Sequence, residues 1–188
     1  MPSRPVLIIS GTNRPGSNTR RVAKLVEEHY TNQNLPSEFF DLVDLPAEVF
    51  EPTVYSKKPP SVVAIQRRIL DAAGLHIVTP EYNGSFPGIL KYFIDLLKFP
   101  ESFDRKPVAF VGVAAGVFAA LRPVEQLQMI FSYRNAHIYP DRVFIATVSE
   151  KLSPEGRLID AALDQRLSRQ AAGFTRFAAA FSSDLPST

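Results

Sequence analysis

Cysteine is absent from the sequence. Disulfide bonds, iron–sulfur clusters, thiolate zinc sites and a cysteine nucleophile are therefore excluded. Histidine is scarce, and no two of His29, His76 and His137 have the spacing of a metal-binding pair on a helix. The Gly-x-Ser-x-Gly turn of the serine hydrolases is missing as well. We accordingly expect no metal site, and we nominate no side chain as a catalytic acid, base or nucleophile.

The sequence also lacks a strong excess of charge and a long apolar run. Its formal net charge is +2, which argues against a dedicated nucleic-acid-binding protein with a concentrated basic face. No run of about 18 apolar residues occurs, and the N-terminus has no basic segment followed by a long apolar one, so neither membrane insertion nor secretion is indicated. We expect a cytoplasmic location. The 188 residues fit a single domain, residues 1–188, with a frayed tail at 182–188.

Short apolar runs alternate with amphipathic stretches along the chain. Strands are expected at residues 6–10, 38–42, 75–79, 108–113 and 143–147. Helices are expected at residues 18–30, 61–73, 88–99, 118–133 and 157–181. This alternation predicts an α/β fold, in which a parallel sheet of five strands forms the middle of a three-layer, doubly wound arrangement with right-handed crossovers.

A turn rich in glycine, hydroxyl and amide side chains, residues 11–19, follows the first predicted strand. The helix after it directs its unpaired N–H groups and the positive end of its dipole at this turn, which favours an anionic ligand. A dinucleotide-binding loop needs a glycine where Asn13 stands. The loop of ATP- and GTP-binding proteins matches at Gly11 and Gly16 but then requires a lysine, and Ser17 occupies that position. Both designs are disfavoured.

The side chains of this turn suit a single phosphate monoester, which is dianionic and offers three acceptor oxygens. They are hydroxyls, amides and one guanidinium: Thr12, Asn13, Arg14, Ser17, Asn18 and Thr19. One alternative stays open, in which Ser17 or Asn18 only caps the helix and Arg14 lies in solvent.

A second unusual loop, residues 80–88, follows the third predicted strand, where ligands of open parallel sheets bind. Asn83-Gly84 is often a hairpin turn, but its flanks here are a buried strand and a helix that begins at Pro87, so we do not expect a hairpin. A positive φ at Gly84 would turn consecutive N–H groups outward, and Tyr82 would add a planar surface. The loop therefore suits the rim of a flat, polar heteroaromatic ring. In the alternative, Tyr82 packs on the core and Asn83 closes its own turn.

With both loops, Gly-Thr-Asn-Arg-Pro-Gly-Ser-Asn and Pro-Glu-Tyr-Asn-Gly-Ser-Phe-Pro-Gly, the sequence resembles the NADPH-dependent FMN reductase family. That family has the flavodoxin-like fold and includes quinone, azo-dye and chromate reductases. The resemblance covers residues 6–145 and implies the strand order 2-1-3-4-5, with FMN as cofactor and NADPH or NADH as electron donor. It implies that the FMN phosphate is held by Thr12, Arg14, Ser17, Asn18 and Thr19. It also implies that the isoalloxazine ring is bordered, largely through backbone groups, by Pro80, Glu81, Tyr82, Asn83, Gly84 and Ser85.

The loop after the fourth predicted strand departs from the family pattern. Members commonly carry a serine and several glycines there, beside the pyrimidine edge of the flavin. This chain has Ala114 and Ala115 followed by a single glycine, Gly116, which the resemblance makes a further flavin-binding candidate. A hydroxyl donor is missing, and the added Cβ atoms reduce how closely the backbone can approach a ligand. We expect flavin affinity or reduction potential to differ from the family norm.

The resemblance implies an FMN-dependent NAD(P)H oxidoreductase. NAD(P)H would stack on the exposed flavin face, transfer a hydride to N5 and leave, and a small acceptor would then take its place: a quinone, an azo compound, free flavin or a metal oxyanion. An FMN-binding electron carrier or regulatory module without NAD(P)H turnover is a second hypothesis, although such carriers often present an acidic docking face. A nucleotide or sugar-phosphate binder that uses only the first loop is a third.

Two further segments bear on assembly and specificity. The helix predicted at residues 88–99 has more apolar circumference than one sheet face needs. This pattern and the family resemblance suggest a homodimer or homotetramer whose neighbour completes the flavin pocket; burial of the helix within one subunit is the alternative.

Residues 46–60 are rich in proline and predict a long surface loop with an exposed Tyr55. This loop would help to determine which acceptor shapes fit the site.

Overall fold

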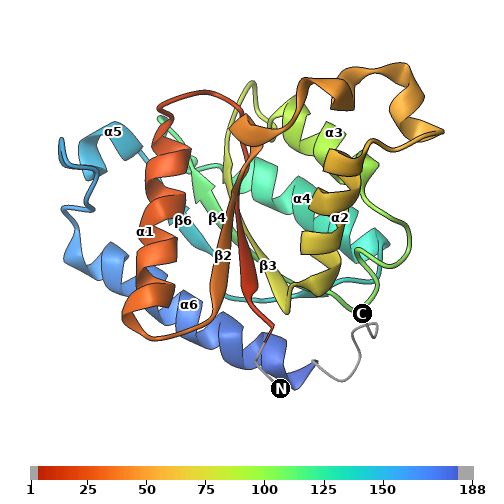
Figure 1. Ribbon diagram of the computed structural model, residues 1–188. Coiled ribbons are helices and arrows are strands. Elements are labelled where there is room, and N and C mark those ends of the chain that lie inside the picture. The colour runs from red at the N-terminus through yellow and green to blue at the C-terminus, as the bar shows by residue number, and fades with distance from the viewer. Residues whose placement is uncertain (1–3, 182–188) are drawn as a thin grey trace.

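The computed structural model describes residues 4–181 (Figure 1). The predicted tail at 182–188 lies outside these residues. The strands are β1 (Val6–Ser10), β2 (Ser37–Asp41), β3 (Gly74–Pro80), β4 (Pro107–Val113), β5 (His137–Ile138) and β6 (Val143–Ile145). The helices are α1 (Asn18–Asn32), α2 (Pro60–Asp71), α3 (Gly88–Leu96), α4 (Leu121–Tyr133), α5 (Val148–Lys151) and α6 (Ala161–Ala180). Short 3₁₀ turns are η1 (Leu42–Asp44), η2 (Ala47–Phe50) and η3 (Pro52–Tyr55).

The strands form one parallel sheet in the order β2-β1-β3-β4-β5, which confirms the predicted order 2-1-3-4-5. The fifth position holds two segments, because β5 pairs with Pro107 and Val108 while β6 pairs with Val111–Val113 farther along the same strand. Pro140 lies between the two segments and has no N–H to donate. The strand predicted at 143–147 therefore extends only over β6. The prediction missed β5, the other segment at this position of the sheet.

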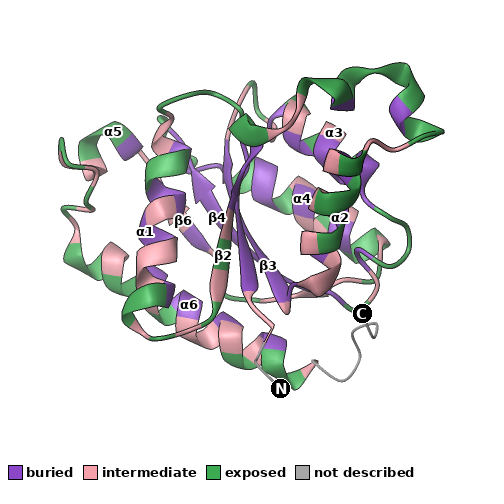
Figure 2. Ribbon diagram, in the orientation of Figure 1, coloured by how far each residue is buried: buried purple, intermediate pink, exposed green. Residues whose placement is uncertain are grey.

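Helices cover both faces of the sheet, and this confirms the three-layer arrangement (Figure 1). Side chains alternate between the two faces along each strand. Leu7, Ile9 and Phe110 join the cluster beneath α2, α3 and α4, whereas Ile8 and Val111 join the cluster beneath α1 and α6. Strands β1, β3 and β4 are buried along their whole length (Figure 2). Their continuous apolar sequences follow from this burial on two faces.

A chain of buried hydrogen bonds lies between the sheet and the helices α1 and α6. The amide nitrogen of Gln170 donates to the carbonyl oxygens of Phe110 and Asp141, so its oxygen must accept. His76 therefore donates from Nε2 to Gln170, at 3.1 Å, and its Nδ1 accepts from the Tyr30 hydroxyl, at 3.0 Å. His76 is thus a hydrogen-bonded core histidine.

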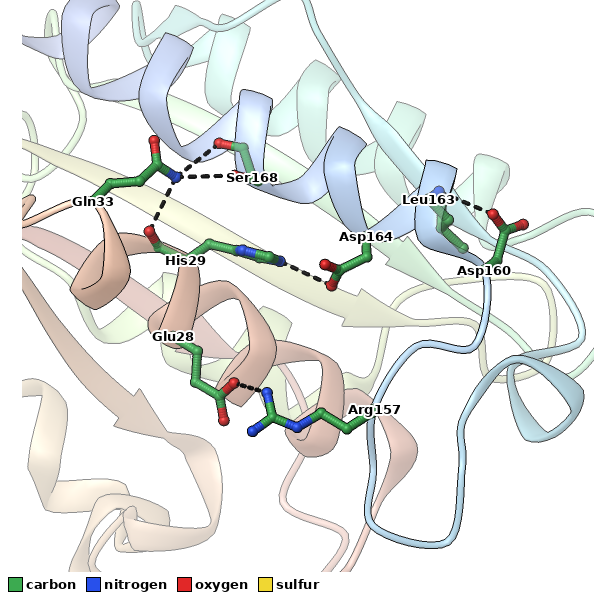
Figure 3. A network of polar contacts seen from close by, with 8 residues as sticks. All are labelled: Glu28, His29, Gln33, Arg157, Asp160, Leu163, Asp164 and Ser168. Carbon is green, nitrogen blue, oxygen red and sulfur yellow. Dashed lines mark hydrogen bonds and ion pairs between the residues drawn. The ribbon is translucent and has the colours of Figure 1, made fainter.

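Polar contacts join α1 to α6 and to the segment before it (Figure 3). The side chain of Glu28 pairs with Arg157, and His29 Nε2 lies 3.0 Å from an oxygen of Asp164. Asp160 caps α6 by accepting from the N–H groups of its first turn. The helix predicted from residue 157 accordingly begins only at Ala161.

Residues 46–60 are more ordered than the predicted loop. They contain η2 and η3, and the buried side chains Val49 and Val54 pack with Val62 of α2 and Leu96 of α3. The Tyr92 hydroxyl of α3 donates to the carbonyl oxygen of Val49 at 2.5 Å. These contacts fix the segment against α2 and α3.

Candidate functional site

A cavity of about 500 Å³ lies where β1, β3, β4 and β6 reach their carboxyl ends. We call it the phosphate-loop cavity. It is lined by Arg14, Pro15, Gly16, Ser17, Asn18, Thr19, Pro80, Glu81, Tyr82, Val113, Ala114, Ala115, Val148 and Ser149. Its volume falls within the range of about 300 to 1,000 Å³ of cofactor sites. The structure thus brings both predicted loops to one cavity.

The first loop surrounds one end of this cavity with hydrogen-bond donors. Gly16 has a φ of +67°, a conformation that glycine adopts without strain and that turns the chain into α1. Ser17 caps α1 by accepting from the N–H of Arg20 at 3.1 Å, as the capping alternative proposed, yet it also lines the cavity. Asn18 and Thr19 begin the helix, where N–H groups have no partner within the helix. Arg14 adds an exposed guanidinium.

Thr12 differs from the other predicted phosphate ligands, because its side chain is buried and does not line the cavity. Its hydroxyl oxygen lies 3.0 Å from the Tyr82 hydroxyl and accepts from the N–H of Arg14 at 3.2 Å. Thr12 therefore holds the first loop against the second and sets the position of Arg14.

The second loop contains the tight turn that we did not expect. Tyr82 and Ser85 exchange two backbone hydrogen bonds, of 2.8 and 3.1 Å, across Asn83 and Gly84. The φ angles of Asn83 and Gly84 are +52° and +77°, as in a hairpin turn of type I′. The positive φ predicted at Gly84 is confirmed, but the rejection of a hairpin turn was wrong, because the turn closes locally without two flanking strands.

The second loop is also attached to α4. Glu81 pairs with Arg122 at 3.2 Å, and the Ser85 hydroxyl donates to Gln126 at 2.6 Å. Among the predicted residues of this loop, Pro80, Glu81 and Tyr82 line the cavity, whereas Asn83, Gly84 and Ser85 do not. A ring in the cavity would therefore lie nearer the start of the loop than its tip.

The loop after β4 approaches the cavity through Ala114 and Ala115, not through Gly116, which is exposed outside the lining. Farther along, Ala119 and Ala120 have φ angles of +53° and +62°. Left-handed backbone costs roughly 1 to 2 kcal/mol for a residue with a Cβ atom. The helix was predicted to begin at residue 118. Because this strained pair is not in the right-handed helical conformation, α4 begins only at Leu121.

Sequence reasoning missed the contribution of α5, whose residues Val148 and Ser149 line the cavity. The Asn18 side-chain nitrogen lies 3.4 Å from the Ser149 hydroxyl, so this segment closes the cavity beside the phosphate loop. The position of this segment in the sequence could have indicated its role, since α5 follows the fifth strand position at the same carboxyl edge of the sheet.

The residues present fit the phosphate and the ring of FMN. A helix N-terminus, an arginine and several hydroxyl and amide groups surround one end of the cavity, and a polar loop with a tyrosine borders the rest. Among residues 4–181, no group of three or more histidine, aspartate or glutamate side chains is placed to hold a metal ion. None of the helices in this range combines the length and apolar character that a membrane crossing requires.

Comparisons with known proteins agree with this geometry. A model of the NADPH-dependent FMN reductase family matches residues 5–150. The FMN-dependent NADPH-azoreductase of Staphylococcus aureus is 31% identical over 131 residues, which cover 66% of this chain and 67% of that protein.

Two solved structures share the fold. The flavoenzyme FerB, an NAD(P)H:acceptor oxidoreductase from Paracoccus denitrificans, has a TM-score of 0.78 and 23% identity, and the match covers 95% of this chain and 98% of FerB. An oxidoreductase from Corynebacterium diphtheriae has a TM-score of 0.76 and 21% identity, over 94% of this chain and 97% of that one. The flavodoxin-like fold is therefore confirmed, and the chain belongs to the NADPH-dependent FMN reductase family.

Proposed function

We propose that this protein passes electrons from NAD(P)H to a small acceptor through FMN bound in the phosphate-loop cavity. The observation that carries the proposal is the convergence of two loops on one cavity, an anion-binding turn at one end and a polar, tyrosine-bearing loop along the side. When bound, FMN would supply the reversible uptake and release of a hydride.

The residues of the chain would bind and orient the cofactor. Arg14, with the first turn of α1, would neutralise the phosphate, and Ser17, Asn18 and Thr19 would donate hydrogen bonds to its oxygens. Pro80, Glu81 and Tyr82 would border the ring, and the N–H groups at the turn of Asn83 and Gly84 lie free of the two hydrogen bonds that close it. The Ser85 hydroxyl donates to Gln126, and the backbone N–H and carbonyl oxygen of Ser85 close the turn with Tyr82, so Ser85 would contribute by fixing the shape of the loop.

Rapid mixing tests the proposed function. We expect the purified protein to take up FMN and the bound flavin to bleach when NADPH or NADH is added in the absence of oxygen. Reoxidation by a quinone should restore the yellow colour. A protein that takes up no FMN, or a bound flavin that neither donor bleaches, would contradict the proposal.

We also propose a homo-oligomer. The apolar circumference of α3, from which the sequence suggested an oligomer, does not support one, because Leu90, Phe93 and Ile94 are buried within the subunit. A different surface supports it. Met129 and Tyr133 of α4 are 69% and 80% exposed. They share one face of that helix with Leu121, and the preceding loop adds the exposed side chains Val117 and Phe118.

Light scattering distinguishes a monomer from a dimer or tetramer at working concentration. We expect an oligomer, and we expect Met129→Lys to dissociate it because a charge would have to be desolvated in the interface. Arg67→Glu on α2 is a control on another exposed helix. A monomeric parent protein would contradict this proposal. The cytoplasmic location stays a prediction from the sequence.

A further inference from the structure

A second cavity, of about 430 Å³, adjoins the first. It is lined by Asn13, Phe50, Tyr82, Pro87, Gly88, Ile89 and Tyr92, and we call it the aromatic cavity. The two cavities are neighbours because Tyr82 lines both and because Asn13 directly precedes Arg14 of the phosphate loop. A molecule in the aromatic cavity would therefore lie next to whatever occupies the phosphate-loop cavity.

The aromatic cavity presents ring surfaces rather than hydroxyl groups. The Tyr82 hydroxyl is engaged with Thr12, and the Tyr92 hydroxyl donates to the carbonyl oxygen of Val49. The rings of Phe50 and Tyr92 lie 5.3 Å apart and are inclined by 30°. Such an arrangement suits contact with the face of another planar ring.

The charge of the lining also differs between the cavities. Arg14 lines the phosphate-loop cavity, but none of the described residues that line the aromatic cavity carries a charge. Asn13 contributes an exposed amide, whose N–H groups can donate to a carbonyl oxygen. This lining favours an uncharged planar carbonyl compound, because it offers no positive charge to compensate the desolvation of a metal oxyanion.

Phe50 is 55% exposed, so the core does not account for its position. It is nevertheless held in place, because its neighbour Val49 is fully buried and η2 is fixed against α3 by the Tyr92 hydrogen bond. A large apolar ring on a fixed backbone at a cavity wall is an arrangement that binding sites use.

We propose that the aromatic cavity receives the electron acceptor, that its uncharged ring lining selects planar quinones over metal oxyanions, and that Phe50 is a specificity-determining residue. This inference rests on the proposed function. NADPH, a proton and the quinone would give NADP⁺ and the hydroquinone: the quinone gains two electrons and two protons, as a hydride that originates from NADPH and a proton from solvent.

Gly88, a second residue of the lining, gives an independent test of the cavity. A Cβ atom at this position meets no atom within 4 Å, and Gly88 begins α3 without a positive φ. A leucine there should fold normally and extend into open space at the cavity. It would narrow the cavity without touching the phosphate loop.

The experiment measures steady-state kinetics of the FMN-loaded protein with two quinones, 1,4-benzoquinone and the larger 2-methyl-1,4-naphthoquinone, and with chromate as a charged acceptor. We expect Phe50→Ala to raise the KM for the naphthoquinone about threefold to tenfold, because a ring contact is lost. Gly88→Leu should raise the KM for the naphthoquinone more than that for benzoquinone. The KM for chromate should change in neither variant.

Phe99→Ala is the matched control, since Phe99 is 63% exposed beyond the far end of α3 and does not line the cavity. Phe50→Ala and Phe99→Ala proteins with equal quinone KM values would overturn the inference. So would a Phe50→Ala or Gly88→Leu protein in which only the KM for NADPH rises, because the cavity would then serve the donor. Failure of the parent protein to bind FMN or to react with NADPH would instead refute the proposed function, and this inference with it.

Discussion

The hydroxyl groups of Thr12 and Tyr82 lie 3.0 Å apart, although the two residues are 70 positions apart in the sequence. This hydrogen bond joins the loop after β1 to the loop after β3 at the edge of the phosphate-loop cavity. Because Thr12 also accepts from the backbone N–H of Arg14, it couples the backbone at Arg14 to the tyrosine side chain. Thr12 thus acts as a positioning residue in this structure, and its predicted contact with the FMN phosphate stays a prediction.

A double-mutant cycle measures this coupling. Thr12→Val and Tyr82→Phe each remove one hydroxyl of the pair, and each should lower the free energy of unfolding by about 0.5 to 1.5 kcal/mol. The double variant should lose less than the sum, because the second substitution finds the hydrogen bond already broken. Denaturant unfolding of the four proteins gives the coupling, and strictly additive losses would show that the two hydroxyls do not interact.

Arg14 should contribute directly to FMN binding. Loss of a charge-assisted hydrogen bond in Arg14→Ala should weaken FMN binding by roughly 1 to 3 kcal/mol. The FMN affinity of Arg14→Lys should lie between those of the parent protein and Arg14→Ala, because an ammonium keeps the charge but lacks the planar guanidinium. Fluorescence titration of FMN measures the affinity, with Arg21→Ala on the exposed surface of α1 as a control of equal charge. Unchanged affinity in Arg14→Ala would mean that the loop serves only as a helix cap.

Two glycines near the cavity should respond differently to alanine. A Cβ atom on Gly112 would lie 2.6 Å from the carbonyl oxygen of Ala119 and 2.8 Å from a ring carbon of Phe144. Gly112→Ala should therefore lower the free energy of unfolding by about 1 to 3 kcal/mol. A Cβ atom on Gly116 meets nothing within 4 Å, so Gly116→Ala should change stability by less than about 0.5 kcal/mol. Thermal unfolding compares the two, and equal shifts would argue against this packing of the loop after β4.

Stability should fall in mild acid through His76. Burial lowers the pKa of His76 to about 4, although its hydrogen bond with Gln170 acts in the opposite direction. In the unfolded chain the pKa is about 6.5, so between pH 6.5 and 4 the unfolded state takes up a proton that the folded state does not. The free energy of unfolding should therefore decrease as the pH falls, with a slope of up to about 1.4 kcal/mol per pH unit from this group.

His76→Gln provides the comparison, because glutamine can still hydrogen-bond to Tyr30 and Gln170 but does not titrate. Denaturant unfolding at pH 7, 6 and 5 should show a smaller decrease in the variant than in the parent protein. The same decrease in both proteins would assign the acid sensitivity to other groups.

Much of the fold can be predicted from sequence, because strands buried on both faces are continuous apolar runs. The prediction at residues 6–10 coincides with β1. The fifth strand position could not be predicted fully, because its two parts contain two and three residues and have no pattern of their own. Only pairing with β4 makes them strands. The turns η2 and η3 were missed for a related reason, since contacts of Val49 and Val54 with α2 and α3 order a segment whose composition indicates a loop.

The two main loops of the site could be identified because their residue types are unusual for their positions. The hydrogen bonds among them could not. The hydroxyl side chain of Thr12 is of the type that binds phosphate, and only the fold shows that this hydroxyl contacts Tyr82. The left-handed φ angles of Ala119 and Ala120 are equally hidden, because alanine after a strand predicts an early helix rather than a strained turn.

The position of Tyr82 between the two cavities has an optical consequence. The chain has no tryptophan, so its ultraviolet emission comes from its six tyrosines. Tyr82 and Tyr92 line the aromatic cavity, and Tyr55 contacts Tyr92 edge to face. A flavin or a quinone absorbs in the range where tyrosine emits, so each should quench this emission when it binds. Occupancy of both cavities can thus be followed in the unlabelled protein by the fluorescence of its own side chains.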